Sequence, residues 1–135
     1  MIFSSLAATM FGRSREIRRL DDALRSSGLH PRLVPDAIKI TVLKLLKEEG
    51  FGYNAPVDAC ALAADMLAYS MLGDQGFYEV HSESKRNVLE ERLKAALASE
   101  NNLDAQIILL TLHAKLIQDD LITRYNLSAG ARSDI

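Results

Sequence analysis

Residues 101–124, NNLDAQIILLTLHAKLIQDDLITR, carry the pattern that decides the fold. Apolar side chains return there every three or four positions, which is the spacing of residues on one face of an α-helix. Asn101 or Asn102 is suited to cap the start of such a helix, and Asp104 in its first turn complements the helix dipole. The pattern therefore predicts one long, strongly apolar C-terminal helix that ends near Arg124.

This predicted helix is apolar on two nearly opposite sides. One stripe consists of Ile107, Leu110, Ala114, Ile117 and Leu121. The second stripe consists of Ile108, Leu109, Leu112 and Leu116. A helix with two apolar sides is either the central helix of its own domain, or it packs on its core with one side and on a second subunit with the other. Both interpretations stay open, and the second makes the second stripe a candidate homodimer interface.

Four further helices are predicted upstream from the same spacing and from residues that typically begin and end helices. They run from about 14 to 27, from 35 to 50, from 54 or 55 to 72, and from 82 or 84 to 99. Sustained alternation of polar and apolar residues, which a strand requires, is almost missing from the sequence. The fold class expected is all-α, with about five helices in one compact domain of orthogonal or bundle-like packing.

Length and composition agree with a single domain. The chain has 135 residues, of which 48% are hydrophobic and 25% are charged, unlike a disordered chain or a disulfide scaffold. Residues 13–127 form the expected helical domain, between an apolar N-terminal segment, 1–12, and a polar tail, 128–135. The net charge of −2 is too close to balance to indicate a polyanionic partner for the whole protein.

The N-terminal apolar run does not have the features of a targeting segment. Its first basic residue, Arg13, follows the run, whereas a signal peptide carries its positive charges first. The run is also shorter than the roughly 20 apolar residues that span a bilayer. The single cysteine, Cys60, cannot form an intramolecular disulfide, which fits a reducing compartment. We therefore expect a cytoplasmic protein with no membrane span.

A basic segment is the first candidate for a binding site. Residues 12–32 contain six arginines and three acidic residues, a local charge of +3, whereas residues 33–135 carry a charge of −5. Arg15, Arg18 and Arg19 fall opposite the apolar stripe of the first predicted helix, so this face could meet phosphates or an acidic partner. A solvated helix face is the alternative. The sequence contains no zinc-ligand pattern or RNA-recognition consensus, so a nucleic-acid role depends on charge alone.

The segment 73–81 is the second candidate, because it is expected to be a loop between two helices and loops often carry sites. Tyr78, Glu79 and His81 could take part in acid–base chemistry or bind a small ligand there. The alternative is a glycine-containing turn whose aromatic side chains close the end of the bundle. Since the sequence has no HExxH or paired-cysteine pattern, it predicts no metal site and no cofactor.

Three hypotheses about function follow. The favoured one is a non-enzymatic helical domain that acts through protein–protein contact, as a homodimer formed by the C-terminal helix, because no set of catalytic residues converges. The second is a nucleic-acid-associated regulator that uses the arginines of the first helix. The third is an enzyme or small-molecule binder built around residues 73–81.

Overall fold

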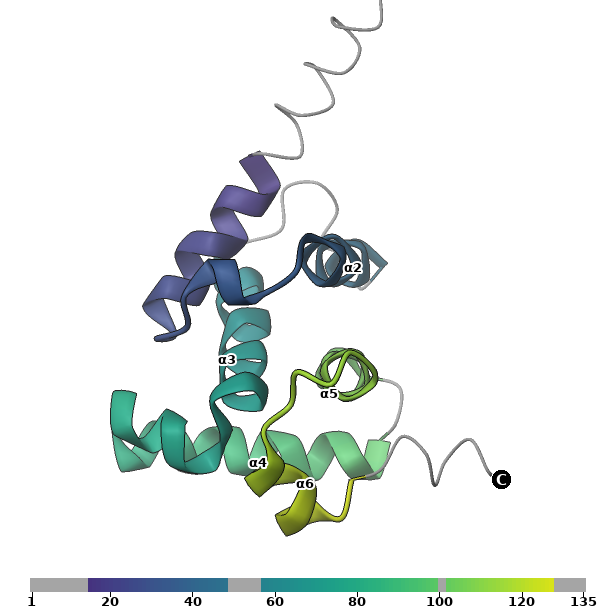
Figure 1. The fold of residues 1–135 in the computed structure, drawn as a ribbon. Coiled ribbons are helices and arrows are strands. Elements are labelled where there is room, and N and C mark those ends of the chain that lie inside the picture. Colours follow the sequence, from purple (N-terminus) through teal and green to yellow (C-terminus); the bar gives the residue numbers. More distant parts are fainter. Residues whose placement is uncertain (1–14, 49–56, 100–101, 128–135) are drawn as a thin grey trace, which may run out of the picture.

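The computed structural model describes residues 15–48, 57–99 and 102–127, and the described residues form helices and connecting turns without a strand. The all-α fold class is confirmed. In Figure 1, α3 runs through the middle of the molecule, and it contacts α2, α4, α5 and α6. The central helix is therefore α3 and not the C-terminal helix. The expected segments 1–12 and 128–135 lie outside the described residues.

Residues 15–26 form the first described helix (the N-terminal helix), close to its predicted range. Its end has the hydrogen bonds of a Schellman motif, because the Leu29 N–H donates to the Leu24 carbonyl and the Gly28 N–H donates to the Arg25 carbonyl, both at 3.0 Å. Gly28 has a φ of 88°, and a Cβ atom there would collide with Val80. The predicted end of this helix near residue 27 is thus confirmed, and both backbone conformation and packing require a glycine at position 28.

A 3-10 turn, Pro31–Leu33, leads into α2, Asp36–Leu46, which begins directly after Pro35 as the sequence predicts. The predicted end of this helix at Gly50 lies outside the described residues. Lys39 on α2 is almost fully buried and forms an ion pair of 2.8 Å with Asp21. This pair ties α2 to the N-terminal helix.

The helix α3 spans Val57–Val80 and bends at Gly73, whose φ of 83° and ψ of 173° are not helical. The expectation that 73–81 forms a loop was wrong, because helical turns resume directly after the glycine. The reason is a tertiary contact: an Asp120 carboxylate oxygen accepts a hydrogen bond of 3.2 Å from the Gln75 N–H and so caps the resumed turn. Gly73 is a bend within α3.

The next helix, α4, spans Glu83–Ser99 and agrees with its predicted range. It buries Leu89, Leu93 and Ala96, as the amphipathic pattern indicates. Two further apolar residues of α4, Val88 and Leu97, are 55% and 40% exposed.

The predicted C-terminal helix is divided into two, which corrects the expectation of a single long helix. The first part is α5, Leu103–His113, and its start is capped as predicted because the Asn102 side chain accepts a hydrogen bond from the Ala105 N–H. The chain then turns at Lys115, which has a φ of 60°, and continues as α6, Asp119–Tyr125. The apolar periodicity of the sequence continues past this turn, because Ile117 and Leu121, which follow the turn in the chain, are also buried.

Two backbone contacts explain the division. The Leu116 N–H donates to the Thr111 carbonyl at 2.8 Å, which closes α5, and the Gln118 N–H donates to the Ser70 carbonyl of α3 at 2.9 Å. The chain is thus drawn back to α3, and α6 packs across the bend at Gly73 (Figure 1).

Candidate functional site

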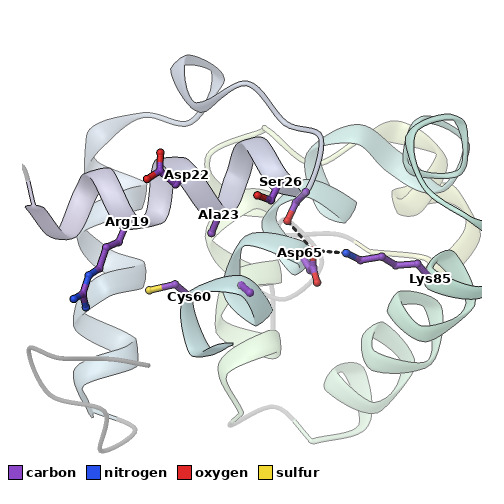
Figure 2. A pocket seen from close by; sticks show the side chains of 9 residues that line it. Arg19, Asp22, Ala23, Ser26, Cys60, Asp65 and Lys85 are labelled. Atoms are coloured by element: carbon purple, nitrogen blue, oxygen red, sulfur yellow. Dashed lines mark hydrogen bonds and ion pairs between the residues drawn. The ribbon is translucent and has the colours of Figure 1, made fainter. Parts of the chain in front are cut away.

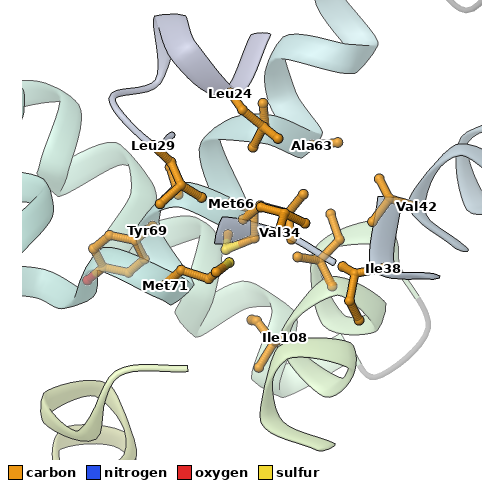
Figure 3. Packing of buried hydrophobic residues seen from close by; sticks show 14 of the residues in the cluster. Leu24, Leu29, Val34, Ile38, Val42, Ala63, Met66, Tyr69, Met71 and Ile108 are labelled. Atoms are coloured by element: carbon orange, nitrogen blue, oxygen red, sulfur yellow. The ribbon is translucent and has the colours of Figure 1, made fainter. Parts of the chain in front are cut away.

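The second apolar stripe of the predicted C-terminal helix does not form a surface. Ile108 and Leu112 are only 3% and 9% exposed, and Leu116 packs against the core. Ile108 lies among side chains of α2 and α3 in Figure 3. The fourth member, Leu109, is half-buried. Because this chain itself covers most of the stripe, these residues belong to the core of the domain and do not present a surface to a second subunit.

The residues expected to form a loop site do not converge. The Arg86 guanidinium lies 5.3 Å from the centre of the Tyr78 ring, and the Glu79 carboxylate accepts a hydrogen bond of 3.5 Å from Gln75. His81 stacks on Phe77 with ring centres 4.2 Å apart, and its Nε2 atom donates to the Ser27 carbonyl. Each side chain has a different structural partner, so the three do not form a set with a shared substrate position.

The arginines of the N-terminal helix lie where the sequence predicts. Six side chains of this helix are exposed: Arg15, Arg18, Arg19, Asp22, Arg25 and Ser26. All six are polar, four are arginines, and the one carboxylate, that of Asp22, is paired with Arg25 at 3.1 Å. We call the four arginines the arginine face. Together with Asp22, the arginine face carries a net charge of +3. It lies on the exposed side of the N-terminal helix, and the opposite side of this helix buries Leu20 and Leu24.

A hollow of about 300 Å³ lies beside the arginine face (Figure 2). Residues of α3 form the floor of this hollow. The N-terminal helix forms one wall, and Lys85 near the start of α4 forms the other. We call it the α3 groove. Its lining residues are Arg19, Asp22, Ala23, Ser26, Ser27, Cys60, Ala61, Asp65 and Lys85.

The polar side chains at one end of the α3 groove hold one another in place. The Ser27 hydroxyl donates to Asp65 at 2.6 Å, and the Lys85 ammonium forms an ion pair with the same carboxylate oxygen at 3.3 Å. These contacts join the N-terminal helix, α3 and α4 (Figure 2). The groove is therefore a preformed feature of the fold, since its two walls are fixed to its floor.

The thiol of Cys60 is not activated. Its side chain is almost completely buried. Burial raises the pKa of the Cys60 thiol, and the positive charge of Arg19 opposes this effect only in part. Because the thiolate is the reactive form, a raised pKa makes Cys60 a poor nucleophile. Within the described residues no three His, Cys, Asp or Glu side chains lie close enough together to hold a metal ion.

Sequence reasoning missed a second polar cluster, which lies among α3, α4 and α6. Asp74 forms ion pairs with Arg86 at 3.1 Å and with Arg124 at 3.2 Å, and Arg124 also bonds Glu90 at 2.8 Å. The Tyr69 hydroxyl donates to Asp74 at 2.8 Å. Burial, followed by this hydrogen bond to a carboxylate, raises the pKa of Tyr69. We call Asp74, Arg86, Glu90 and Arg124 the charge cluster.

Only a fragment of the charge cluster could be found in the sequence. Glu90 and Lys94, four residues apart on α4, have the spacing of an ion pair within one helix, and their charged atoms lie 3.3 Å apart. The Glu90 side chain is only 14% exposed, because Arg124 covers it. The cluster joins residues up to 50 positions apart, and no local spacing reveals such a contact. Its members are paired with one another, although the buried Nε atom of Arg86 has no hydrogen-bond partner, and we assign the cluster a structural role.

No helix of the described ranges combines the length and the apolar character needed to cross a bilayer.

Comparisons with known proteins identify no family for this chain. The chain matches no protein-family model, no curated protein and no solved structure.

Proposed function

We propose that this protein is a non-enzymatic helical domain that acts by protein–protein contact, and that the contact is made by the arginine face. The observation that carries the proposal is the composition of the exposed side of the N-terminal helix, where four of six side chains are arginines. Arginine is enriched at protein interfaces, and its planar guanidinium group binds carboxylates through two parallel hydrogen bonds. An acidic protein surface is therefore the partner that fits.

A protein partner is favoured over a nucleic acid by the surroundings of the arginine face. The rest of the chain, residues 33–135, carries a charge of −5, which repels a long polyanion beyond the immediate contact. The face also borders the α3 groove, whose floor includes Cys60 and Ala61. A groove with an apolar floor is suited to side chains of a protein and offers little to a phosphate backbone.

The arginine face is unsuited to joining two copies of this chain. In a two-fold symmetric dimer the residues at the symmetry axis meet their own copies, so a dimer centred on the arginine face would bring arginines against arginines. We infer that the partner on this face is a different protein. We also place the protein in the cytoplasm, because a lone and buried cysteine fits a reducing compartment.

Photocrosslinking in cells that produce the protein tests this proposal. A benzoylphenylalanine placed at Ser26, which is exposed beside the arginines, is expected to capture a protein. The Arg15→Ala, Arg18→Ala double variant should reduce the crosslinked yield at least fivefold. The matched control is Arg32→Ala, Lys44→Ala, which removes the same charge from exposed positions outside the face and should leave the yield unchanged.

Three results would contradict the proposal. The first is no crosslinked product at Ser26. The second is a product whose added mass is removed by nuclease, which would favour the nucleic-acid hypothesis. The third is an equal loss in both double variants, because it would show that only the overall charge matters.

A further inference from the structure

The α3 groove and the arginine face together point to the shape of the partner, an inference that depends on the proposed function. The groove runs beside a helix of 12 residues, 15–26, which is about 18 Å long at 1.5 Å per residue. The described part of the chain offers no strand edge on which an extended peptide could add a strand. A surface made of helices is instead suited to a helix that lies in the depression between them.

Two exposed apolar side chains lie next to the α3 groove, on the side where α4 packs against α3. Leu62 of α3 and Val88 of α4 are 51% and 55% exposed. Two contacts hold the helices together around this pair: Lys85 with Asp65, and the Arg92 guanidinium, which donates to the Leu62 carbonyl at 2.9 Å. Because Val88 lies one helical turn from Lys85 and one from Arg92, it shares their face of α4. Leu62 and Val88 therefore lie along one seam of α3 and α4.

The two sides of this surface differ in chemistry. On the N-terminal helix the groove is bordered by the net charge of +3 of the arginine face. On the other side the lining of the groove ends at Lys85, and the exposed aliphatic side chains of Leu62 and Val88 lie beyond it along α3 and α4. Asp65, a carboxylate in the groove, is already paired with Lys85 and Ser27, so it leaves no unpaired charge to repel an acidic ligand. The complement of such a surface is a helix that is acidic along one edge and aliphatic along the other.

We infer that the α3 groove receives an acidic amphipathic helix of about three turns from a partner protein. Its carboxylates pair with Arg15, Arg18 and Arg19, and its aliphatic side chains cover Leu62 and Val88. Reversing the bound helix end to end would exchange its acidic and aliphatic edges. Recognition of both edges therefore selects one orientation of the helix, which the charge of the N-terminal helix alone does not do.

The experiment uses two crosslinking positions in the full chain. Benzoylphenylalanine is placed at Ser26, on the arginine side, and in a second protein at Leu62, on the apolar side. Both positions are expected to capture the same partner. Mass spectrometry of the crosslinked peptides should map them to one stretch of about 12 residues, in which the attached positions are separated by three, four or seven residues and acidic side chains predominate on one edge.

A substitution on the apolar side provides the matched control. Val88→Glu should reduce the yield at both crosslinking positions at least fivefold, because it places a carboxylate against the aliphatic edge of the partner. Leu97→Glu, at another exposed apolar position of α4, should leave the yield unchanged. Circular dichroism melting of each variant verifies that the fold is retained.

The outcomes separate the two proposals. No product at either position overturns both of them. A product at Ser26 without one at Leu62, or an unchanged yield in Val88→Glu, leaves protein contact in place but excludes a helix in the groove. Attachment to scattered, basic or extended segments of the partner excludes it as well.

Discussion

At the scale of single residues, Gly73 determines the path of α3. Its φ of 83° and ψ of 173° belong to a region that only glycine occupies without strain. A Cβ atom there would lie 2.5 Å from an Asp120 carboxylate oxygen and 2.9 Å from the Gln118 Cβ. Any side chain would thus strain the backbone and push α6 away from the bend.

We expect Gly73→Ala to lower the free energy of unfolding by about 2 kcal/mol or more, because strain and collision add. Urea titration followed by circular dichroism measures this change. Gly76→Ala is the matched control: Gly76 has an ordinary helical backbone, and its added Cβ would lie 3.2 Å from the Leu72 Cβ. Helix propensity favours alanine at that position by up to about 1 kcal/mol. Equal destabilisation by the two substitutions would contradict this account of the bend.

Cys60 allows a second measurement at a single residue. Its burial raises its pKa, so the thiolate fraction at pH 8 is lower than in an unfolded chain, and reagent has little access. We expect the native protein to react with a thiol-specific disulfide reagent at least tenfold more slowly than the urea-unfolded protein at the same pH. Raising the pH should speed the native reaction as the thiolate forms. A native rate equal to the unfolded rate would show that the thiol is open to solvent.

At the scale of elements, the charge cluster attaches α6, a helix of only seven residues, to the rest of the molecule. Asp74 contributes most of the bonds, since it accepts from Tyr69 and pairs with Arg86 and Arg124. Removing its carboxylate leaves two guanidinium groups and a hydroxyl without this acceptor in a partly buried site, which costs more than the loss of a surface ion pair.

Asp74→Ala should therefore lower the free energy of unfolding by about 2 kcal/mol. Hydrogen exchange followed by NMR should show the amides of α6 exchanging faster than those of α4. Glu91→Ala is the control, because the Glu91 side chain is 75% exposed and its loss should cost under about 0.5 kcal/mol. Unchanged protection of α6 in the Asp74 variant would mean that apolar packing alone holds this helix.

The element boundaries show what the sequence could predict. The ends set by local chemistry, such as the Asn102 cap and the stop at Gly28, agree with the structure. The two errors, the loop at 73–81 and the single C-terminal helix, occur where contacts with distant residues decide the conformation. The arginine face could be predicted because it follows the period of one helix. The α3 groove could not, because its lining comes from three separate helices.

At the scale of the whole molecule, the six most exposed large apolar side chains in the described residues are Leu33, Leu62, Tyr78, Val80, Val88 and Leu97. None of them belongs to the stripe on which the predicted homodimer depends. Two of that stripe's members, Ile108 and Leu112, are buried, and Leu116 packs against the core. The prediction of a homodimer thus lacks the surface from which it was derived.

Sedimentation equilibrium of the purified chain and of a Leu109→Lys, Leu116→Lys variant tests this conclusion. We expect the substitutions to lower the free energy of unfolding by at least about 2 kcal/mol, because a lysine at position 116 must leave the core or bury its charge. Urea titration measures that loss. A dimeric wild type together with a stable, folded monomeric variant would restore the interface interpretation.

The cap that Asp120 provides for the Gln75 N–H has a consequence for synthesis on the ribosome. The acceptor is encoded 45 residues after the donor. At about 5–20 residues per second, translation needs roughly 2–9 seconds to cover that interval. During this time the nascent chain contains the whole of α3 without the contact that caps the turn after its bend. The last part of α3 is therefore expected to become fixed only late in translation, when the C-terminal residues emerge and close the domain.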